Sequence, residues 1–503
     1  MKTQNKTITD EQIKMLGVSL SEAQTLENIL KRKPTIEEVV LFCLLWSEDK
    51  VNEDDERIEN VLSSNGRIAK YVRLVDDKSI FSQVFQKGDS EVVAASERIK
   101  SLATIFGGNP REEINLKQTI AYLKDLKAND GKFFFDNESN SAPYGHIHNY
   151  GIGMTPVDDD KKLISEIGKP SVKLNLEREE NHEPFDIEKV DFPEDLAEVA
   201  VLLLSNPNIA STNKLFLQNS SGIKSSVNID NLVFSLSNNT RYAYQHPKIG
   251  AALNIAKTAR DLVCKGVRPI FFTSGINASE SHFEVLAYFV AGINKIASRL
   301  SLSNIAANIS INEENKNPSV SIALGGVKLG KTLEPGFKEK GELIFLIGKN
   351  KEDIGSSEYL SSYHGVSKSP APYFDLDEEV VLYNVLGSLI EKEMISSAES
   401  VAEGGIFVAL TKLSIPQTLG FDIVTDAEIR EDAFLFGESS GRVIVSVNET
   451  AEDKFIEFMM ESGVSYTLLG HVTKGKMVVD DQHFGFSEGL KDIYNESTTN
   501  LIK

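Results

Sequence analysis

The chain has 503 residues, a formal net charge of −21 at pH 7, and 41% hydrophobic and 25% charged residues. This length exceeds what one hydrophobic core holds, so we expect two to four domains, and the composition is typical of a soluble globular protein. The acidic balance argues against nonspecific binding to nucleic acid or to an anionic membrane, because phosphate neutralisation needs clustered Lys and Arg.

The sequence contains no apolar run of the roughly 18 residues that a membrane helix needs. The N-terminus, MKTQNKTITDEQ, also lacks the apolar core of a signal peptide. We therefore expect a cytoplasmic protein. The two cysteines, Cys43 and Cys264, have apolar neighbours on predicted helices, which favours buried thiols over a disulfide or a catalytic pair.

The first 195 residues carry few clear signals. Residues 8–50 indicate a small helical unit, in which Thr35 and Glu38 have capping-box spacing before a mainly apolar helix. The polar stretch 131–155 holds His146 and His148, which could face one metal from a strand. No third ligand follows at a recognisable spacing, so a polar loop is favoured over a metal site. The acidic stretch 177–195 is typical of a linker or an exposed connection.

The clearest local signal is the stretch 241–277, which predicts a loop, a helix, a tight turn, a strand and a second loop. Pro247 fits the first turn of a helix, and Gly266 fits a left-handed cap before a strand over 268–273. Small residues, Ala252 and Ala256 among them, recur at helical spacing and predict a helix packed closely on a sheet. The two flanking loops lie at the same end of this unit, where α/β folds usually bind ligands.

Helices and strands alternate along the rest of the chain, which predicts α/β layers. Helices are expected over 196–204, 283–300, 378–393 and 406–413. Strands are expected over 232–236, 305–311, 320–327, 341–348 and 441–447. Two more strands, 466–472 and 476–479, are expected to pair with each other across a Thr-Lys-Gly turn.

Several stretches together resemble the large synthetase subunit of phosphoribosylformylglycinamidine synthase, a family in the aminoimidazole ribonucleotide synthetase-like superfamily. The N-terminal PTIEEVVLFCLLWSE resembles its small linker domain. Further blocks follow in family order: LLSNPNIAS (203–211), the stretch 241–277, NISINEEN (308–315), GSSEYL (355–360), SAESVAEGG (397–405) and FGESSGR (436–442). Their order and spacing argue against chance similarity.

This resemblance implies an α/β fold: an aminoimidazole ribonucleotide synthetase-like two-domain half, preceded by a small helical linker domain and a divergent region. The implied boundaries are 1–50 for the helical linker domain, 51–195 for a divergent or reduced first-half region, 196–335 for an N-terminal-type α/β domain and 336–503 for a C-terminal-type α/β domain. Residues 51–195 are too few for the complete first half, which the family needs for its principal active site.

The chain departs from the family where carboxylates would hold magnesium. The family's Thr-Asp, Asp-Pro-Tyr and Thr-Asp-Cys are here Leu236-Ser237, His246-Pro247-Lys248 and Thr273-Ser274-Gly275. Two aspartates of the block at 397–405 are here Ser400 and Glu403, so only Glu403 keeps a charge. Magnesium bridging ATP phosphates wants carboxylate oxygens, which serine or glycine does not replace. The sequence therefore predicts no metal ligands.

The resemblance assigns contacts with ATP or ADP to Arg241, Asn277, Asn308, Glu314, Gly404 and Gly405, and leaves the catalytic residues unassigned. Gly404, Gly405 and Gly441 fit either phosphate contact through backbone amides or tight turns, and turns are favoured. Glu314, Glu358, Glu438 and Arg442 match family positions, and they fit either polar anchors or the ion pairs of a domain interface.

Two hypotheses of function follow from the resemblance. The first is a reduced synthetase subunit of purine biosynthesis, an ATP-dependent C–N ligase that amidates formylglycinamide ribonucleotide together with glutaminase and small bridging subunits. The second is a non-catalytic binding or scaffold protein derived from that enzyme. The missing carboxylates favour reduced or lost catalysis, with any nucleotide held with little dependence on magnesium.

Overall fold

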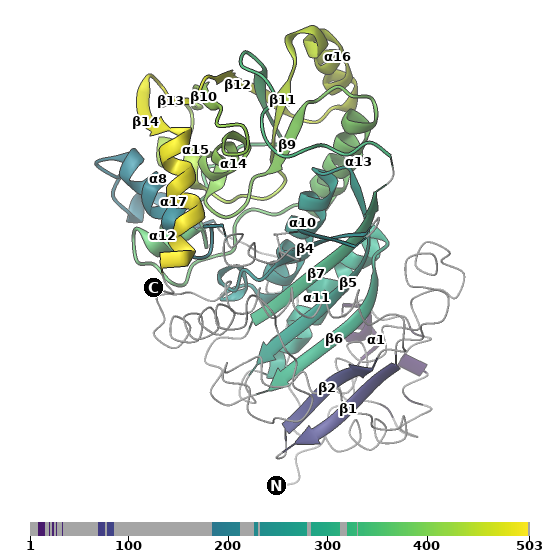
Figure 1. Cartoon of the computed structure of the whole chain (residues 1–503). Coiled ribbons are helices and arrows are strands. Elements are labelled where there is room, and N and C mark those ends of the chain that lie inside the picture. The colour runs from purple at the N-terminus through teal and green to yellow at the C-terminus, as the bar shows by residue number, and fades with distance from the viewer. Residues whose placement is uncertain are drawn as a thin grey trace.

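A computed structural model of the chain describes residues 9–15, 20, 23–24, 27, 33, 69–75, 78–84, 184–211, 226–229, 232–278, 283–311, 319–328 and 330–500. In these residues the chain forms two seven-stranded sheets with their helices (Figure 1). The α/β fold class is confirmed. The predicted linker helix after Thr35, the histidines His146 and His148, and Cys43 lie outside the described residues. None of the described helices is long and apolar enough to cross a membrane.

The first sheet has the strand order β1-β2-β6-β5-β7-β4-β3. Helices α10 (Pro247–Val263) and α11 (Phe283–Leu300) pack on each other and share a core with this sheet. Strands β5 and β6 are parallel, whereas β7 runs antiparallel to both β5 and β4. Its strands are β1 (Ala69–Val75), β2 (Lys78–Val84), β3 (Ser226–Ile229), β4 (Leu232–Ser237), β5 (Val267–Ala278), β6 (Ser303–Ile311) and β7 (Ser319–Lys328).

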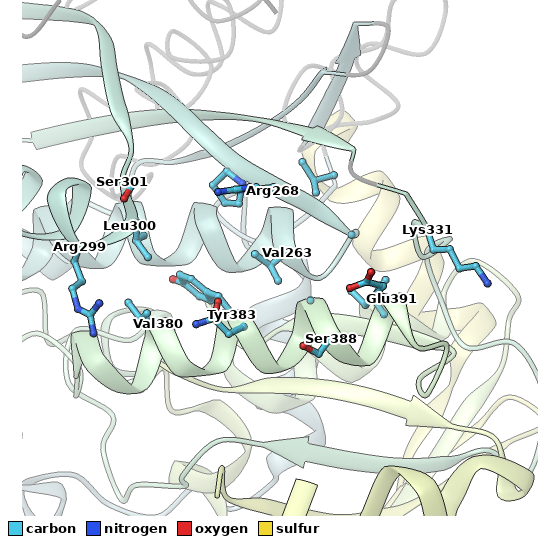
Figure 2. Close-up of a pocket in the computed structure, with 16 residues that line it drawn as sticks. Val263, Arg268, Arg299, Leu300, Ser301, Lys331, Val380, Tyr383, Ser388 and Glu391 are labelled. Carbon is cyan, nitrogen blue, oxygen red and sulfur yellow. The ribbon is translucent and has the colours of Figure 1, made fainter. Parts of the chain in front are cut away.

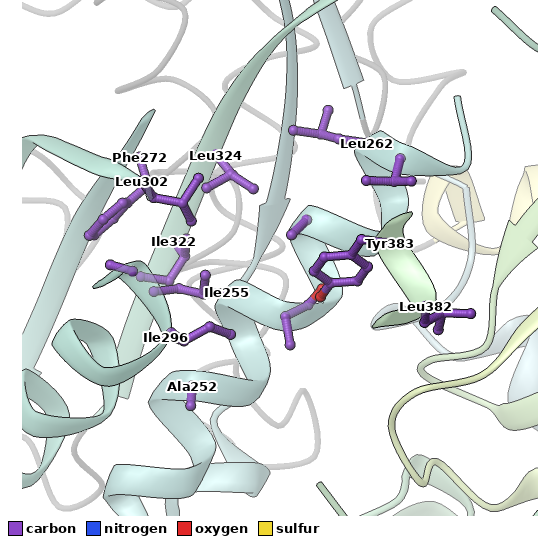
Figure 3. Packing of buried hydrophobic residues seen from close by; sticks show 14 of the residues in the cluster. Ala252, Ile255, Leu262, Phe272, Ile296, Leu302, Ile322, Leu324, Leu382 and Tyr383 are labelled. Carbon is purple, nitrogen blue, oxygen red and sulfur yellow. The ribbon is translucent and has the colours of Figure 1, made fainter. Parts of the chain in front are cut away.

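The structure confirms the helix–turn–strand unit at 247–273. Pro247 occupies the first turn of α10, and Gly266 ends the unit's turn at a φ of 73°. Ala252 and Ala256 are buried against the first sheet's core (Figure 3). Strand β5 is longer than predicted, because Ser274 to Ala278 continue the pairing with β6 and β7 instead of forming a loop.

The second sheet has the strand order β14-β13-β10-β12-β8-β11-β9. Helix α13 (Leu376–Glu391) begins at Asp375, whose carboxylate accepts hydrogen bonds from the amides of Asp377 and Glu378. The strands are β8 (Leu343–Ile347), β9 (Ser397–Ser400), β10 (Gly420–Ile423), β11 (Val443–Val447), β12 (Tyr466–Thr473), β13 (Lys476–Val479) and β14 (Gln482–Phe486). The other helices are α12 (Glu358–Ser362), α14 (Gly405–Ser414), α15 (Glu431–Phe436), α16 (Glu452–Ser462) and α17 (Ser487–Asn500).

The predicted hairpin of β12 and β13 is wrong. Strand β10 lies between them, antiparallel to β12 and parallel to β13. Gly420 permits this insertion, because a Cβ there would lie 2.1 Å from the carbonyl oxygen of Lys476. The four residues of β10 are too few to give a strand signal of their own, so the local pattern suggested the neighbour in sequence.

Helix α8 (Leu196–Ser205) packs with the second sheet's elements, against α12, α14, α17 and β14. Its buried residues Val199 and Leu203 belong to the core cluster of that sheet. The short helix η4 (Ile187–Lys189) lies there too, since Arg430 donates hydrogen bonds to the carbonyls of Ile187 and Val190. This part of the expected exposed connection is therefore packed, and the domain boundaries at 195 and 335 stay a prediction.

One hydrophobic cluster spans the two layers. The largest cluster joins Ile255 of α10 and Ile322 of β7 with Leu382 of α13 and with Phe345 of the second sheet (Figure 3 shows the first three). Tyr383 of α13 also donates a hydrogen bond from its hydroxyl to the carbonyl of Ala256, at 2.7 Å. Since α10 contacts both sheets' elements, it sets the distance between the two layers. The remaining short elements are α1 (Asp10–Met15), η5 (Arg241–Ala243) and η7 (Glu449–Ala451).

Candidate functional site

Five of the family-like blocks of the sequence meet at one place between the two layers. We call this place the polar junction and define it by Arg241, Tyr242, Glu358, Gly404 and Glu438. Arg241 and Tyr242 belong to η5 just before α10, and Glu358 begins α12. Gly404 caps α14, and Glu438 follows α15. The segments are far apart in sequence but contact one another through hydrogen bonds and an ion pair.

Glu358 is the first carboxylate of the polar junction. Its Oε2 lies 2.7 Å from Nη1 of Arg241, and both side chains are almost fully buried. The amides of Asn206 and Asn208, from the block LLSNPNIAS, donate to the two oxygens of Glu358 at 2.9 Å each. Every oxygen of this carboxylate therefore has a donor within the chain.

Glu438 is the second carboxylate, and it accepts three hydrogen bonds. The backbone amides of Glu358 and Gly404 donate to Oε1 at 2.7 and 2.9 Å, and the hydroxyl of Tyr242 donates to Oε2 at 2.6 Å. Two of these donors are amides at helix N-termini, which is the place where proteins usually bind anions. The carboxyl group of Glu438 thus occupies this place from within the chain.

Burial dominates the electrostatics of the polar junction. It raises the pKa of Glu438 to about 7, while Arg241 and the hydrogen bonds from Tyr242 and Glu358 oppose that shift. Burial also works against the charged form of Arg241, but Glu358 and Glu438 outweigh it and raise the pKa of that guanidinium. Arg241 therefore stays protonated and holds the two layers together as a cation.

The turn at Gly404 and Gly405 requires glycine for steric reasons. Both residues have positive φ, 80° and 70°. A Cβ on Gly404 would lie 2.4 Å from Cγ2 of Val408, and one on Gly405 would lie 2.4 Å from the carbonyl oxygen of Leu435. The amide of Gly405 donates to the carbonyl of Ala402 at 2.9 Å. Both amides already have acceptors in the chain, so a phosphate could use them only by displacing one.

The positions that carry aspartates in the family lie side by side in the first sheet. Ser237 of β4 and Ser274 of β5 both pair with Ile322 of β7, so they face the same side of three adjacent strands. Both are buried, at 1% and 0% exposure. The hydroxyl of Ser237 donates to Oδ1 of Asn254 in α10, at 2.5 Å. The side-chain amide of Asn254 and the hydroxyls of Ser237 and Ser274 thus occupy the place where the family resemblance predicts carboxylates.

Glu403 keeps the one acidic charge of these motifs, but it is paired. Its Oε2 lies 2.8 Å from Nζ of Lys257. Burial alone would raise the pKa of Glu403, yet Lys257 lowers it to about 2. Nearby Lys412 lies 3.7 Å from Glu399. Among the residues that the structure describes, no group of three or more His, Cys, Asp or Glu could hold a metal ion.

Two of the remaining predicted contacts are placed by their backbone alone. Asn277 of β5 pairs with Ser310, and Asn308 of β6 pairs with Gly275, so the two asparagines lie on neighbouring parallel strands. Glu314 lies outside the described residues. Arg241 and Gly404 are joined through Glu358 and Glu438 in the polar junction.

The sequence analysis missed Arg260, a fully buried arginine of α10. Its guanidinium forms an ion pair with Glu379 of α13 and donates to the hydroxyls of Ser400 and Ser440 at 3.0 and 2.9 Å. It also donates to the carbonyl of Val401 at 3.3 Å. The sequence does contain a signal for this ion pair. An arginine on the otherwise small and apolar face of a helix needs a buried partner, so its position predicts one.

Arg442 and Cys264, two further residues considered in the sequence, are both buried. Arg442 donates to the carbonyls of Ser439 and Gly437, at 3.0 and 2.8 Å, and lies within the second layer instead of pairing across the interface. Burial, with Arg260 adding to it, lowers the pKa of Arg442 to about 10. Cys264 is a free, buried thiol, as expected.

Two family matches cover the described layers. Residues 224–327 match the family described as "AIR synthase related protein, N-terminal domain", and residues 339–481 match "AIR synthase related protein, C-terminal domain". Among curated proteins, "Phosphoribosylformylglycinamidine synthase subunit PurL" of Alkaliphilus metalliredigens is 27% identical over 371 residues, which are 65% of this chain and 50% of that protein. The chain is a PurL-like member of the AIR synthase superfamily.

Other PurL proteins give the same picture. The PurL subunit of Thermus thermophilus is 30% identical over 249 residues, which are 47% of this chain and 34% of that protein. The chain spans about half the length of the first curated relatives it matches. The solved structure "T. maritima PurL complexed with AMPPCP" is 15% identical, with a TM-score of 0.49, and the match covers 64% of this chain and 54% of that one.

Proposed function

We propose that this PurL-like chain is a non-catalytic subunit of purine biosynthesis, in which the two described layers act as a rigid scaffold. Its curated relatives are named as subunits of phosphoribosylformylglycinamidine synthase, so glutaminase and small bridging subunits of that synthase are its candidate partners. Such an enzyme is an ATP-dependent C–N ligase. In this proposal the chain descends from such an enzyme and binds the same partners, but it does not catalyse the amidation.

One observation carries this proposal: the ligands that magnesium and phosphate would need are missing or occupied. Ser237 and Ser274 occupy two positions where carboxylates are expected, and the backbone amide of Gly404 donates its hydrogen bond to Glu438. Magnesium is a hard cation that prefers carboxylate oxygens in octahedral positions, and hydroxyls buried under a helix do not supply them. The polar junction supports a closed interface better than an open site.

A nucleotide is still a candidate ligand, because three solved PurL structures carry ATP, ADP or AMPPCP in their titles. In this chain we propose that ATP or ADP binds with little dependence on magnesium. The contacts would come from the loop at Arg241, the turn at Gly404 and Gly405, and the strands with Asn277 and Asn308. Glu438 would have to leave the Gly404 amide for a phosphate to use it.

Calorimetric titration of the purified chain with ATP and with ADP, each with and without magnesium, tests this proposal. We expect the affinity for either nucleotide to change by less than about threefold on adding magnesium, well under the tenfold that 1.4 kcal/mol represents. Glu438→Gln removes the competing negative charge and should tighten any nucleotide binding. Magnesium-dependent tightening of ATP binding by tenfold or more would reveal a metal site and contradict the proposal.

A further inference from the structure

A groove opens at the far end of α10 from the polar junction. It has a volume of about 560 Å³ and lies between the start of β5, the end of α11 and one face of α13 (Figure 2). This volume is within the range of small-molecule sites, about 300–1,000 Å³. The 17 residues of α10 separate the groove from Arg241, by about 25 Å at 1.5 Å per residue. The groove is therefore a separate site.

The face of α13 that lines the groove is open. Val380, Asn384, Gly387 and Ser388 recur on one side of the helix and line the groove, together with Tyr383, whose hydroxyl is bonded to the carbonyl of Ala256. A Cβ on Gly387 would meet nothing within 4 Å. A glycine inside a helix costs about 1 kcal/mol relative to alanine, and packing within the described chain does not require this one. Its position leaves room along the groove.

The charges of the groove divide into paired and unpaired groups. Arg299 forms an ion pair with Asp377 at 3.0 Å, and Lys331 forms one with Glu393. Within the described residues, Arg268 on the β5 wall and Glu391 on the α13 wall have no ion-pair or hydrogen-bond partner. As far as the described residues go, the groove thus has one cation and one anion whose side chains lack a partner. In Figure 2, Arg299 lies at one end of the groove and Lys331 at the other.

Aliphatic side chains also line the groove. Val263 and Val267 come from the first layer, Leu300 from α11, and Val380 and Ile390 from α13. An apolar surface flanked by one free guanidinium and one free carboxylate is complementary to a ligand with an apolar body and both charges. A simple anion would be repelled by Glu391, and a simple cation by Arg268.

We propose that this groove binds a small zwitterion with an apolar body, an apolar amino acid or dipeptide, with its carboxylate on Arg268 and its ammonium group on Glu391. The planar fork of an arginine matches a carboxylate in two hydrogen bonds, and capture of peptide termini by such groups is a known mode of recognition. This site goes beyond the proposed function and does not depend on the polar junction.

Calorimetric titration of the full chain with L-leucine and with L-leucyl-L-leucine tests the proposal and distinguishes its two sources. At least one should bind saturably in the millimolar range or tighter, since two charge-assisted contacts act together. Arg268→Gln and Glu391→Gln should each weaken that binding about tenfold or more. Glu457→Gln, which removes an exposed carboxylate of α16 outside the groove, is the control and should change it little.

Chemical variants of the ligand test each charged contact separately. The N-acetylated form lacks the ammonium group, so it should bind the unaltered chain weakly and should not weaken further with Glu391→Gln. Gly387→Trp should block the groove, whereas Gly387→Ala should leave binding intact, with folding of both checked by circular dichroism. Absence of saturable binding of both probes, or binding that neither charge variant weakens, would overturn the proposal.

Discussion

At the scale of single residues, two arginines connect the first layer to α13, and their surroundings differ. Arg260 and its partner Glu379 are almost fully buried, with 2% and 0% of their side chains exposed. Arg299 and its partner Asp377 are 51% and 82% exposed. Removing one partner of a buried pair leaves an uncompensated charge, whereas an exposed pair is screened by solvent. The buried pair should therefore dominate the attachment of α13.

Replacing either arginine by methionine tests this difference. Arg260→Met should lower the free energy of unfolding by about 3–5 kcal/mol, because Glu379 remains buried without its cation. Arg299→Met should cost about 1 kcal/mol or less. Denaturant unfolding of both variants measures the two values. Equal losses would mean that the buried pair has no special role in joining the layers.

A second residue-scale prediction concerns pH and Glu438. Its folded pKa of about 7 lies above the value of about 4.3 for an unfolded chain. The folded state therefore holds the proton more tightly, so this contribution to stability is complete below pH of about 4.3 and is lost as the pH rises through about 7. We compare the unfolding free energy of the unaltered chain with that of Glu438→Gln. As the pH rises through this window, the unaltered chain should lose on the order of 3 kcal/mol of stability relative to the variant.

Denaturant unfolding of both proteins at several pH values between about 5 and 8 measures that difference. The comparison cancels groups that titrate equally in both proteins. A difference that stays constant with pH would mean that the three donors around Glu438 offset its burial.

At the scale of elements, α10 was the part best predicted from sequence. Pro247, Gly266 and the small residues between them are local signals, and each acts through the backbone or through close packing. The polar junction was predicted only as a set of matching positions. Its contacts join residues up to 196 positions apart, as for Tyr242 and Glu438, and no local pattern encodes such pairing. The insertion of β10 between β12 and β13 was missed for the same reason.

The close packing of α10 can be tested at Ala256. This residue is fully buried, and its carbonyl accepts a hydrogen bond from Tyr383. Ala256→Leu should overpack the space between α10 and its neighbours and cost about 1–3 kcal/mol. Val381→Leu, at an exposed position of α13, is the control and should be nearly neutral. An unchanged thermal midpoint for Ala256→Leu would mean that α10 does not pack as described.

At the scale of the whole molecule, the two layers form one body with a shared core and a closed polar interface. The α/β class and the order of the family blocks could be predicted from sequence. The attachment of α8 to the second layer could not, because its apolar face fits either layer equally well by pattern. The chain also spans about half the length of the first curated relatives it matches.

The central claim is that this chain does not catalyse the synthetase reaction. The most direct measurement is ADP production from formylglycinamide ribonucleotide, ATP, magnesium and an ammonium salt, first with the chain alone and then with glutaminase and bridging subunits added. The PurL subunit of Thermus thermophilus serves as the positive control. The account predicts no substrate-dependent ADP above background in either run. Turnover by the chain alone would contradict it. Turnover only in the second run would also contradict it and would indicate a site completed by a partner.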